Sequence, residues 1–155
     1  MDQNLFDFCY NISKKNETVR AFSTFVSNAS KPFFFIFYLA GIVYVSVFDI
    51  KKITPFTLIP LVCILTSFLL RKLIKKPGPV PEYRNDNSFP SNHAASSGVI
   101  AAAFFYVNTP TGILLAVLAV LTGVSRVFSG LHYPYDVLAG WVLALLFGLL
   151  FLTGA

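Results

Sequence analysis

The sequence predicts an all-α integral membrane protein, a polytopic bundle of about five transmembrane helices preceded by an amphipathic helix. Hydrophobic residues make up 55% of the 155-residue chain, charged residues make up 12%, and the mean hydropathy is +0.69. This composition is too apolar and too poor in charge for an ordinary soluble domain of that size. We therefore expect a multi-pass protein of a cell membrane, in which no linker, internal repeat or second globular domain interrupts the spans.

Five apolar runs account for the expected spans. They cover residues 33–48, 53–70, 94–107, 112–124 and 135–153. A transmembrane helix needs about 20 apolar residues, or about 17 when the flanking side chains snorkel. Several of the runs are shorter than this, so we expect their helices to extend into the polar flanks.

The N-terminal residues 1–30 have a different pattern. Their apolar side chains are interspersed with polar ones, and the first long apolar run begins only near Pro32, after four cationic residues. That order does not fit a signal peptide and is typical of an amphipathic helix lying along the membrane interface, with a frayed tail as the alternative. We expect an interfacial arm over residues 1–30 and a transmembrane domain over residues 31–155.

The formal charge of +5 is concentrated in one loop. No stripe of alternating aromatic and basic residues for base stacking accompanies these cations, so nucleic acid is not an expected partner. An anionic lipid headgroup is the expected partner, although cations beside a span could also only hold the loop in the cytoplasm. The cations of this loop are Arg71, Lys72, Lys75, Lys76 and Arg84.

The order of the spans predicts that three polar segments share one membrane face. The basic loop 71–90 follows the second run, residues 90–93 open the third, and residues 125–136 join the fourth run to the fifth. Because each crossing changes sides, these segments should emerge together, and the opposite face should be comparatively plain.

The last part of the chain holds few groups capable of chemistry. From residue 87 onward the only charged side chains are Arg126 and Asp136, and both histidines of the chain, His93 and His132, lie in the same stretch. Ionisable groups in membrane segments are costly and mark functional sites by default. Two imidazoles, a carboxylate and the planar donor fork of a guanidinium are suited to transferring a phosphoryl group.

Local sequence suggests how these groups are held. Ser91 is a good N-cap for the helix that follows, and a helix N-terminus offers backbone N–H groups to a phosphate beside His93. Pro134 suits the first turn of the last helix. Asp136 could then reach back to one nitrogen of His132 and leave the other nitrogen free to attack phosphorus.

Each of these residues also has a plainer interpretation. A histidine in a membrane bundle can be a hydrogen-bonding partner between helices, and Arg126 with Asp136 could be a structural ion pair. Two histidines could bind zinc, but no further histidine or cysteine is placed to complete a ligand set, so we expect no metal and no cofactor. The joint occurrence of the residues at fixed spacings favours a phosphatase-type site.

Two segments resemble signature motifs of the type 2 phosphatidic acid phosphatase superfamily, a group of membrane lipid phosphatases related to vanadium haloperoxidases. Residues 125–136, which read Ser-Arg-x5-His-x3-Asp, match the third motif at every fixed position. Residues 90–93 resemble the second motif, with Asn92 where the family usually has glycine. We expect this change to be tolerated because the backbone supplies the donors there.

The first motif of the family, Lys-x6-Arg-Pro, is only partly present. Aligned through its proline, Arg71 stands in place of the lysine and Gly78 in place of the arginine. One cation of the family is thus missing from its usual position. Lys75, Lys76 or Arg84 could replace it.

The resemblance implies a role for each matching residue. His132 would be the nucleophile that forms a phosphohistidine, Asp136 would orient it, and His93 would protonate the leaving oxygen and later help to activate water. Since His132 must be neutral and His93 protonated, activity should depend on pH as a bell-shaped curve. The residues expected to bind the phosphoryl oxygens are Arg71, Ser91, Asn92 and Arg126, with Lys75 and Lys76 as candidates.

The function implied is hydrolysis of a lipid phosphate or diphosphate without a metal ion, on a substrate such as undecaprenyl diphosphate, phosphatidylglycerophosphate or phosphatidic acid. A non-catalytic binder of anionic lipids and a small transporter component are the alternatives. The resemblance favours a site at the outer leaflet, whereas the count of positive charges favours the cytoplasmic face. The sequence leaves this sidedness, the choice of lipid and the oligomeric state open.

Overall fold

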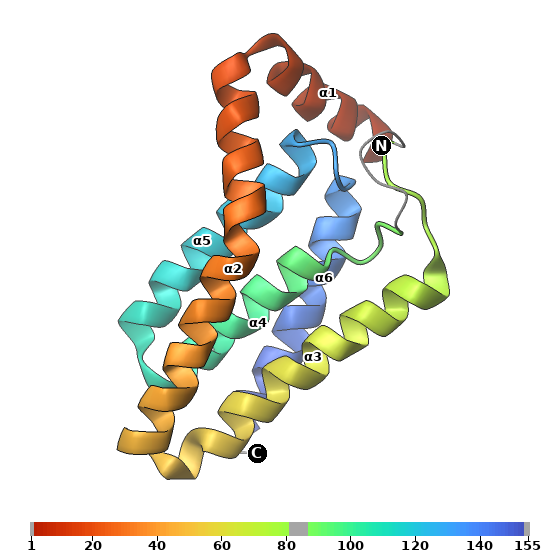
Figure 1. Ribbon diagram of the computed structural model, residues 1–155. Helices are drawn as coiled ribbons and strands as arrows, with labels where there is room; N and C mark the ends of the chain where they lie inside the picture. The colour runs from red at the N-terminus through yellow and green to blue at the C-terminus, as the bar shows by residue number, and fades with distance from the viewer. Residues whose placement is uncertain (1, 81–86, 154–155) are drawn as a thin grey trace.

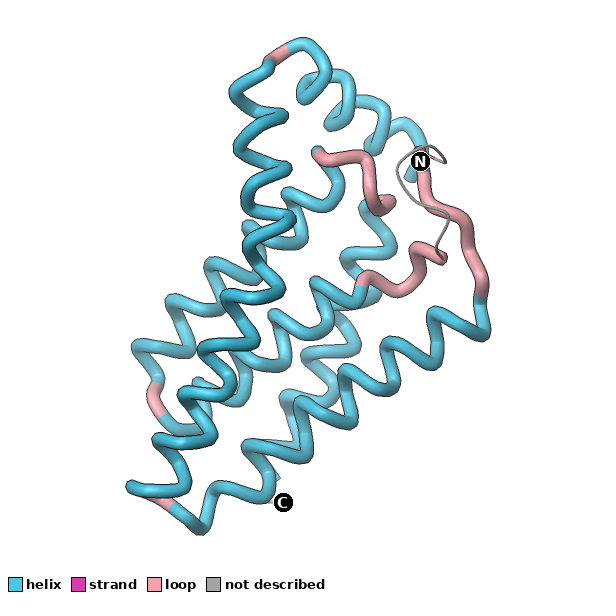
Figure 2. The backbone as a smooth tube through the Cα atoms, viewed as in Figure 1, coloured by secondary structure: helices cyan, strands magenta, loops and turns pink. Residues whose placement is uncertain are grey.

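The computed structural model describes residues 2–80 and 87–153, and these residues form helices and connecting turns with no β-strand among them. The elements in chain order are α1 (Asp2–Lys15), α2 (Glu17–Phe48), η1 (Ile50–Lys52), α3 (Ile53–Ile74), α4 (Asn92–Val107), α5 (Thr109–Phe128), α6 (Pro134–Gly148) and η3 (Leu149–Thr153). Figures 1 and 2 show the resulting bundle. The predicted all-α class is confirmed.

All five predicted apolar runs lie in helices. Four helical segments are long and apolar enough to cross a membrane, namely α2, Ile50–Ile74, α5 and Pro134–Thr153. The remaining run forms α4, which has 16 residues. A helix of that length is about 24 Å long at about 1.5 Å per residue, somewhat short of the hydrocarbon thickness. The multi-pass prediction is confirmed, with four helical segments of spanning length and one shorter helix among the described residues.

The short helix α4 lies at the centre of the bundle. It packs against α2, α3, α5 and α6, and Figure 1 shows it in green between them. Small side chains let helices approach closely, and such packing is a main source of attraction between helices in lipid. The longer helices therefore cover the small residues of α4. Those that are buried include Ala94, Ala95, Ser97, Ala101 and Ala103.

The two ends of the bundle differ in their polar groups. At one end, the turn after α2 lies beside the turn after α4, since Lys52 Nζ is 5.2 Å from the ring centre of Tyr106. Lys52 also pairs there with Asp49, at 3.1 Å. The end of α3, the start of α4, the end of α5 and the start of α6 lie at the opposite end with α1 (Figure 1). The three polar segments therefore share one end, as the alternation of spans predicts.

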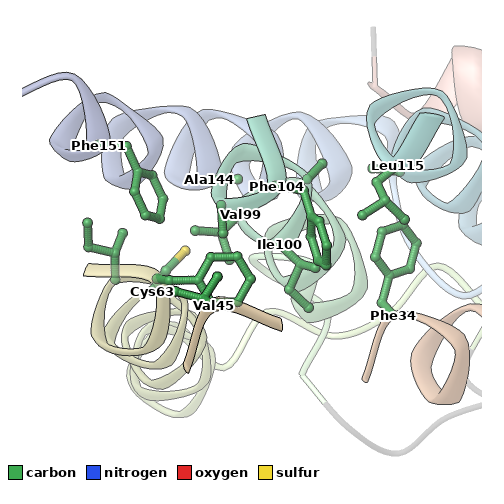
Figure 3. Close-up of a cluster of buried hydrophobic side chains, with 14 residues drawn as sticks. Phe34, Val45, Cys63, Val99, Ile100, Phe104, Leu115, Ala144 and Phe151 are labelled. Carbon is green, nitrogen blue, oxygen red and sulfur yellow. The ribbon is translucent and has the colours of Figure 1, made fainter. Parts of the chain in front are cut away.

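The main apolar core takes side chains from α2, α3, α4, α5 and α6. Phe56 and Phe104 meet edge to face, with ring centres 5.5 Å apart. A Cβ atom at Gly41 would lie 2.6 Å from the Phe56 ring and 2.7 Å from the Phe104 ring, so this glycine makes room for both. Figure 3 shows the cluster, including Phe34 of α2, Cys63 of α3, Val99 of α4, Leu115 of α5 and Ala144 of α6.

The outside of the bundle is also apolar. Large apolar side chains stay exposed along the spanning helices, far more than a soluble protein of this size would show. These exposed side chains face the lipid in a membrane. They include Val47, Phe48, Leu65, Val117, Leu145 and Leu146.

The N-terminal arm consists of two helices, α1 and the first part of α2. The helices α1 and α2 meet at Asn16, whose Oδ1 accepts hydrogen bonds from Thr18 N at 3.0 Å and Val19 N at 3.2 Å. This N-cap begins α2, which then continues without a break past residue 30 into the first span. The second half of the arm is thus the start of α2. The placement of α1 along the interface stays a prediction.

Helix α1 packs on the start of α6. Phe6 is buried, with its ring centre 5.3 Å from that of Tyr10 and 5.5 Å from that of Tyr133. Asp2 Oδ1 accepts a hydrogen bond from Tyr135 N at 3.1 Å. The first helix therefore covers the segment that carries His132.

The contact of α4 with α6 depends on Gly140. A Cβ atom there would lie 2.6 Å from Ser91 O, 2.9 Å from Ala94 Cβ and 3.1 Å from Ala95 N. Since two of these atoms belong to the backbone, Gly140→Ala must push the helices apart, and we expect it to cost about 1–3 kcal/mol of stability. A thermal melt of the detergent-purified protein measures this. Gly78→Ala, whose Cβ would meet only Leu131 O at 3.8 Å, is the control, and equal melting temperatures would contradict the prediction.

Candidate active site

The site is assembled where the first turns of α4 and α6 meet. Ser91 N donates a hydrogen bond to Asp136 O at 2.9 Å, which links the two predicted motifs through the backbone. The close approach at Gly140 lies one turn further along α6. His93, the second residue of α4, is therefore held at the same end of the bundle as His132 and Asp136.

His132 lies in the tight loop between α5 and α6. The helix α5 ends at Phe128, and Gly130 then adopts a positive φ of 75°, a conformation that glycine tolerates best. The chain turns back so that Leu131 N and His132 N both donate to Arg126 O, at 3.0 and 3.3 Å. His132 is fully buried and sits directly above the last turn of α5.

Asp136 is in the first turn of α6, as the sequence predicts. Pro134 is the first residue of this helix, and Asp136 Oδ2 accepts a hydrogen bond from Tyr133 N at 3.0 Å. The same oxygen is 3.9 Å from His132 Nδ1. The carboxylate therefore does reach back toward the imidazole, at a distance longer than a strong hydrogen bond.

The other oxygen of Asp136 contacts a cation. Lys76 Nζ donates to Asp136 Oδ1 at 2.7 Å, although the carboxylate is fully buried. The ammonium also lies 3.6 Å from Asp2 Oδ2 and 4.4 Å from the ring centre of Tyr133. The sequence predicts Lys76 as a candidate for binding phosphate, and in the structure its ammonium contacts the carboxylate of Asp136.

The remaining cations of the basic loop lie at other positions along it. Arg71, in the last turn of α3, donates from Nε to Asn87 O and so ties the two ends of the loop together. Lys75 ends α3 in a left-handed conformation and its side chain is exposed. Position 78 faces Leu131 O, next to the His132 loop, so the arginine that the family carries there would have lain beside the site. Arg84 lies outside the described residues.

The first turn of α4 carries polar groups from the second motif. Ser91 occupies the N-cap position, but its side chain makes no capping hydrogen bond, and its buried hydroxyl has no partner among the described residues. Asn92 Oδ1 accepts a hydrogen bond from Ser67 Oγ of α3. His93 is half-buried. These groups and the N–H groups of the first turn suit an anion.

Arg126 is held by a residue that the sequence analysis did not single out. Its guanidinium is buried, and Nη1 donates to Ser27 Oγ of α2 at 2.7 Å. Ser23, Ser27 and Ser30 are all buried on α2. Their spacing places the three hydroxyl groups on one face of the helix, a polar stripe next to an apolar span that could have pointed to this contact.

The described residues contain no group of three or more histidine, cysteine, aspartate or glutamate side chains that could hold a metal ion. The predicted independence from metal ions remains a prediction, which an assay in the presence of a chelator tests.

Comparison with known proteins decides the family. A sequence profile described as the PAP2 superfamily matches residues 8–154. The chain belongs to the PAP2 superfamily. It is similar to the undecaprenyl-diphosphatase BcrC of Bacillus subtilis, with 42% identity over 66 residues, which are 43% of this chain and 34% of that protein. The matched segment thus covers about a third of the relative's length.

Two crystal structures share the fold of this chain. The structure of Aquifex aeolicus LpxE aligns with a TM-score of 0.77 at 20% identity, over 97% of this chain and 93% of that one. The PAP2 type phosphatidylglycerolphosphate phosphatase of Bacillus subtilis aligns with a TM-score of 0.70 at 25% identity, over 98% and 83%. The resemblance to this superfamily seen in the motifs is confirmed.

The contact between Ser27 and Arg126 can be tested by stability. Ser27→Ala removes the acceptor of a buried charged donor, and we expect this to cost about 1–3 kcal/mol. The melting temperature of the purified protein should fall. Ser46→Ala on the same helix is the matched control, since its exposed hydroxyl only donates to Val43 O at 2.8 Å. Equal shifts for the two variants would show that Ser27 does not stabilise Arg126.

Proposed function

We propose that this PAP2 protein is an integral-membrane phosphatase that hydrolyses lipid phosphates or diphosphates through a phosphohistidine intermediate, without a metal ion. The observation that carries the proposal is the position of Asp136. Its carboxylate faces His132, and its backbone carbonyl binds Ser91 N at the start of the helix that carries His93. One buried residue thus connects both motifs.

The proposed reaction has two steps. A nitrogen of neutral His132 attacks phosphorus, the bond from phosphorus to the leaving oxygen breaks, and His93 gives that oxygen its proton. Water then attacks the phosphohistidine, with His93 taking the proton, and inorganic phosphate leaves with its bond to His132 broken. Asp136 holds the imidazole in one orientation and stabilises the positive charge that forms on it.

Binding of the phosphoryl oxygens falls to the groups around this centre. The buried guanidinium of Arg126, the hydroxyl of Ser91, the N–H groups of the first turn of α4 and the amide of Asn92 lie at the ends of α5 and α4. Donors placed where charge develops in the transition state supply most of the stabilisation in phosphoryl transfer. Arg71 and the exposed Lys75 are further candidates.

The proposed substrate is a lipid whose head carries a phosphate. The two similar Bacillus subtilis proteins are an undecaprenyl-diphosphatase and a phosphatidylglycerolphosphate phosphatase. We propose the same two classes of lipid, and phosphatidic acid, as candidate substrates of this chain. The apolar exterior of the helices lets the tails of such a lipid stay in the bilayer while its head meets the site.

Phosphate release from a panel of these lipids in the presence of EDTA tests the proposal. We expect release by the wild-type protein, inhibition by vanadate, and loss of at least about a thousandfold in rate for His132→Ala or His93→Ala. Lys51→Ala, at the opposite end of the bundle, is the control and should keep its activity. A lipid binder or a transporter component would release no phosphate from any lipid of the panel.

Activity should follow a bell-shaped curve with pH. The attacking His132 must be without its proton and the donating His93 must carry one, so the rate falls at both extremes. The measurement is kcat/KM for one lipid phosphate across a pH series in detergent micelles. A flat profile would contradict the assignment of these two residues as nucleophile and acid.

A further inference from the structure

None of the roles proposed above explains the contact between Lys76 and Asp136. Lys76 Nζ is 2.7 Å from Asp136 Oδ1, and the carboxylate is fully buried. The two residues are 60 positions apart in the sequence. The lysine stands two residues before Gly78, where the family carries an arginine.

A buried carboxylate needs a compensating positive charge. Burying an ionised carboxylate without a partner costs several kcal/mol, so such a group takes up a proton or pairs with a cation. In this site the imidazole of His132 is the other titratable group beside the carboxylate, at 3.9 Å. Without Lys76, the charge of Asp136 would favour the protonated form of His132. A protonated imidazole has no free lone pair and cannot attack phosphorus.

The surroundings hold Lys76 in place. Its ammonium lies over the ring of Tyr133 at 4.4 Å and is 5.9 Å from the ring centre of Phe89. Asp2 Oδ2 lies 3.6 Å away on the other side, at the start of α1. Contacts of this kind restrict a flexible lysine to one position. Lys75, its neighbour in sequence, is exposed instead.

We propose that Lys76 is a positioning residue which acts through Asp136. It neutralises the carboxylate, so that Asp136 can stay ionised and orient His132 while His132 stays neutral and nucleophilic. This inference rests on the proposed function, and it differs from the expectation that Lys76 binds the phosphate of the substrate. The positive charge that compensates the Asp136 carboxylate then comes from Lys76 and not from a protonated His132.

Steady-state kinetics of Lys76→Met on one lipid phosphate test the proposal. We expect kcat to fall about tenfold or more, the usual scale for partners of a catalytic group, while KM and inhibition by inorganic phosphate change by less than about twofold. Lys76→Arg keeps the charge and should recover most of the loss. Lys51→Met, with the same change of charge on an exposed lysine at the opposite end of the bundle, is the matched control and should match the wild type in kcat.

A double variant shows whether Lys76 acts through Asp136. In an Asp136→Asn background the carboxylate is gone, so adding Lys76→Met should lower the residual kcat no further. The double variant also removes the buried carboxylate together with the cation that compensates it, so it should melt at a higher temperature than Lys76→Met alone, which keeps the measurement possible if the single variant unfolds.

Three results would overturn the inference. A rise in KM and weaker inhibition by phosphate with kcat unchanged would show that Lys76 binds substrate. An additional loss of kcat in the Asp136→Asn background would show that it acts independently of the carboxylate. Unchanged kinetics of Lys76→Met would show that it has no role in the reaction. If, in contrast, His132→Ala remains active, the proposed function itself fails, whatever Lys76 does.

Discussion

The close approach of α4 and α6 is the constraint on which the site depends. Gly140 lets the two helices come together. One hydrogen bond, from Ser91 N to Asp136 O, then joins the second and third motifs. Neither motif is sufficient alone, because one carries His93 and the other His132. The small residues of α4 extend the same close packing along the bundle, so the architecture that fills the core also sets the spacing of the proposed catalytic groups.

The charges of the site are satisfied by partners from other helices. Asp136 pairs with Lys76 from the loop after α3, and Arg126 donates to Ser27 of α2. Buried charges in or near a membrane are tolerated only with such partners. Arg126 and Asp136, both in the third motif, are therefore held in part by elements outside that motif, and the candidate site depends on several parts of the bundle.

The sequence predicted the fold class, the apolar runs and the shared end of the three polar segments, because hydropathy and the alternation of spans determine them. It also predicted the start of α6, because Pro134 and Asp136 are local signals. The contacts of Lys76, Ser27 and Asp2 were not predicted, since their partners are 60, 99 and 133 positions away. The division at residue 30 between arm and membrane domain stays a prediction, because α2 continues through that residue without a break.

The hydrogen bond from Arg126 to Ser27 has a mechanical consequence for α2. Successive residues of an α-helix are turned by about 100° around its axis. Inserting or deleting a single residue between Asn16 and Ser27 would therefore break one of two contacts. If the N-cap at Asn16 stays in place, Ser27 turns away from the Arg126 guanidinium. If Ser27 keeps its contact with Arg126, the N-cap and α1 turn instead. The rotation of α2 about its own axis is thus coupled to Arg126 of the third motif, although Ser27 and Arg126 are 99 positions apart in the sequence.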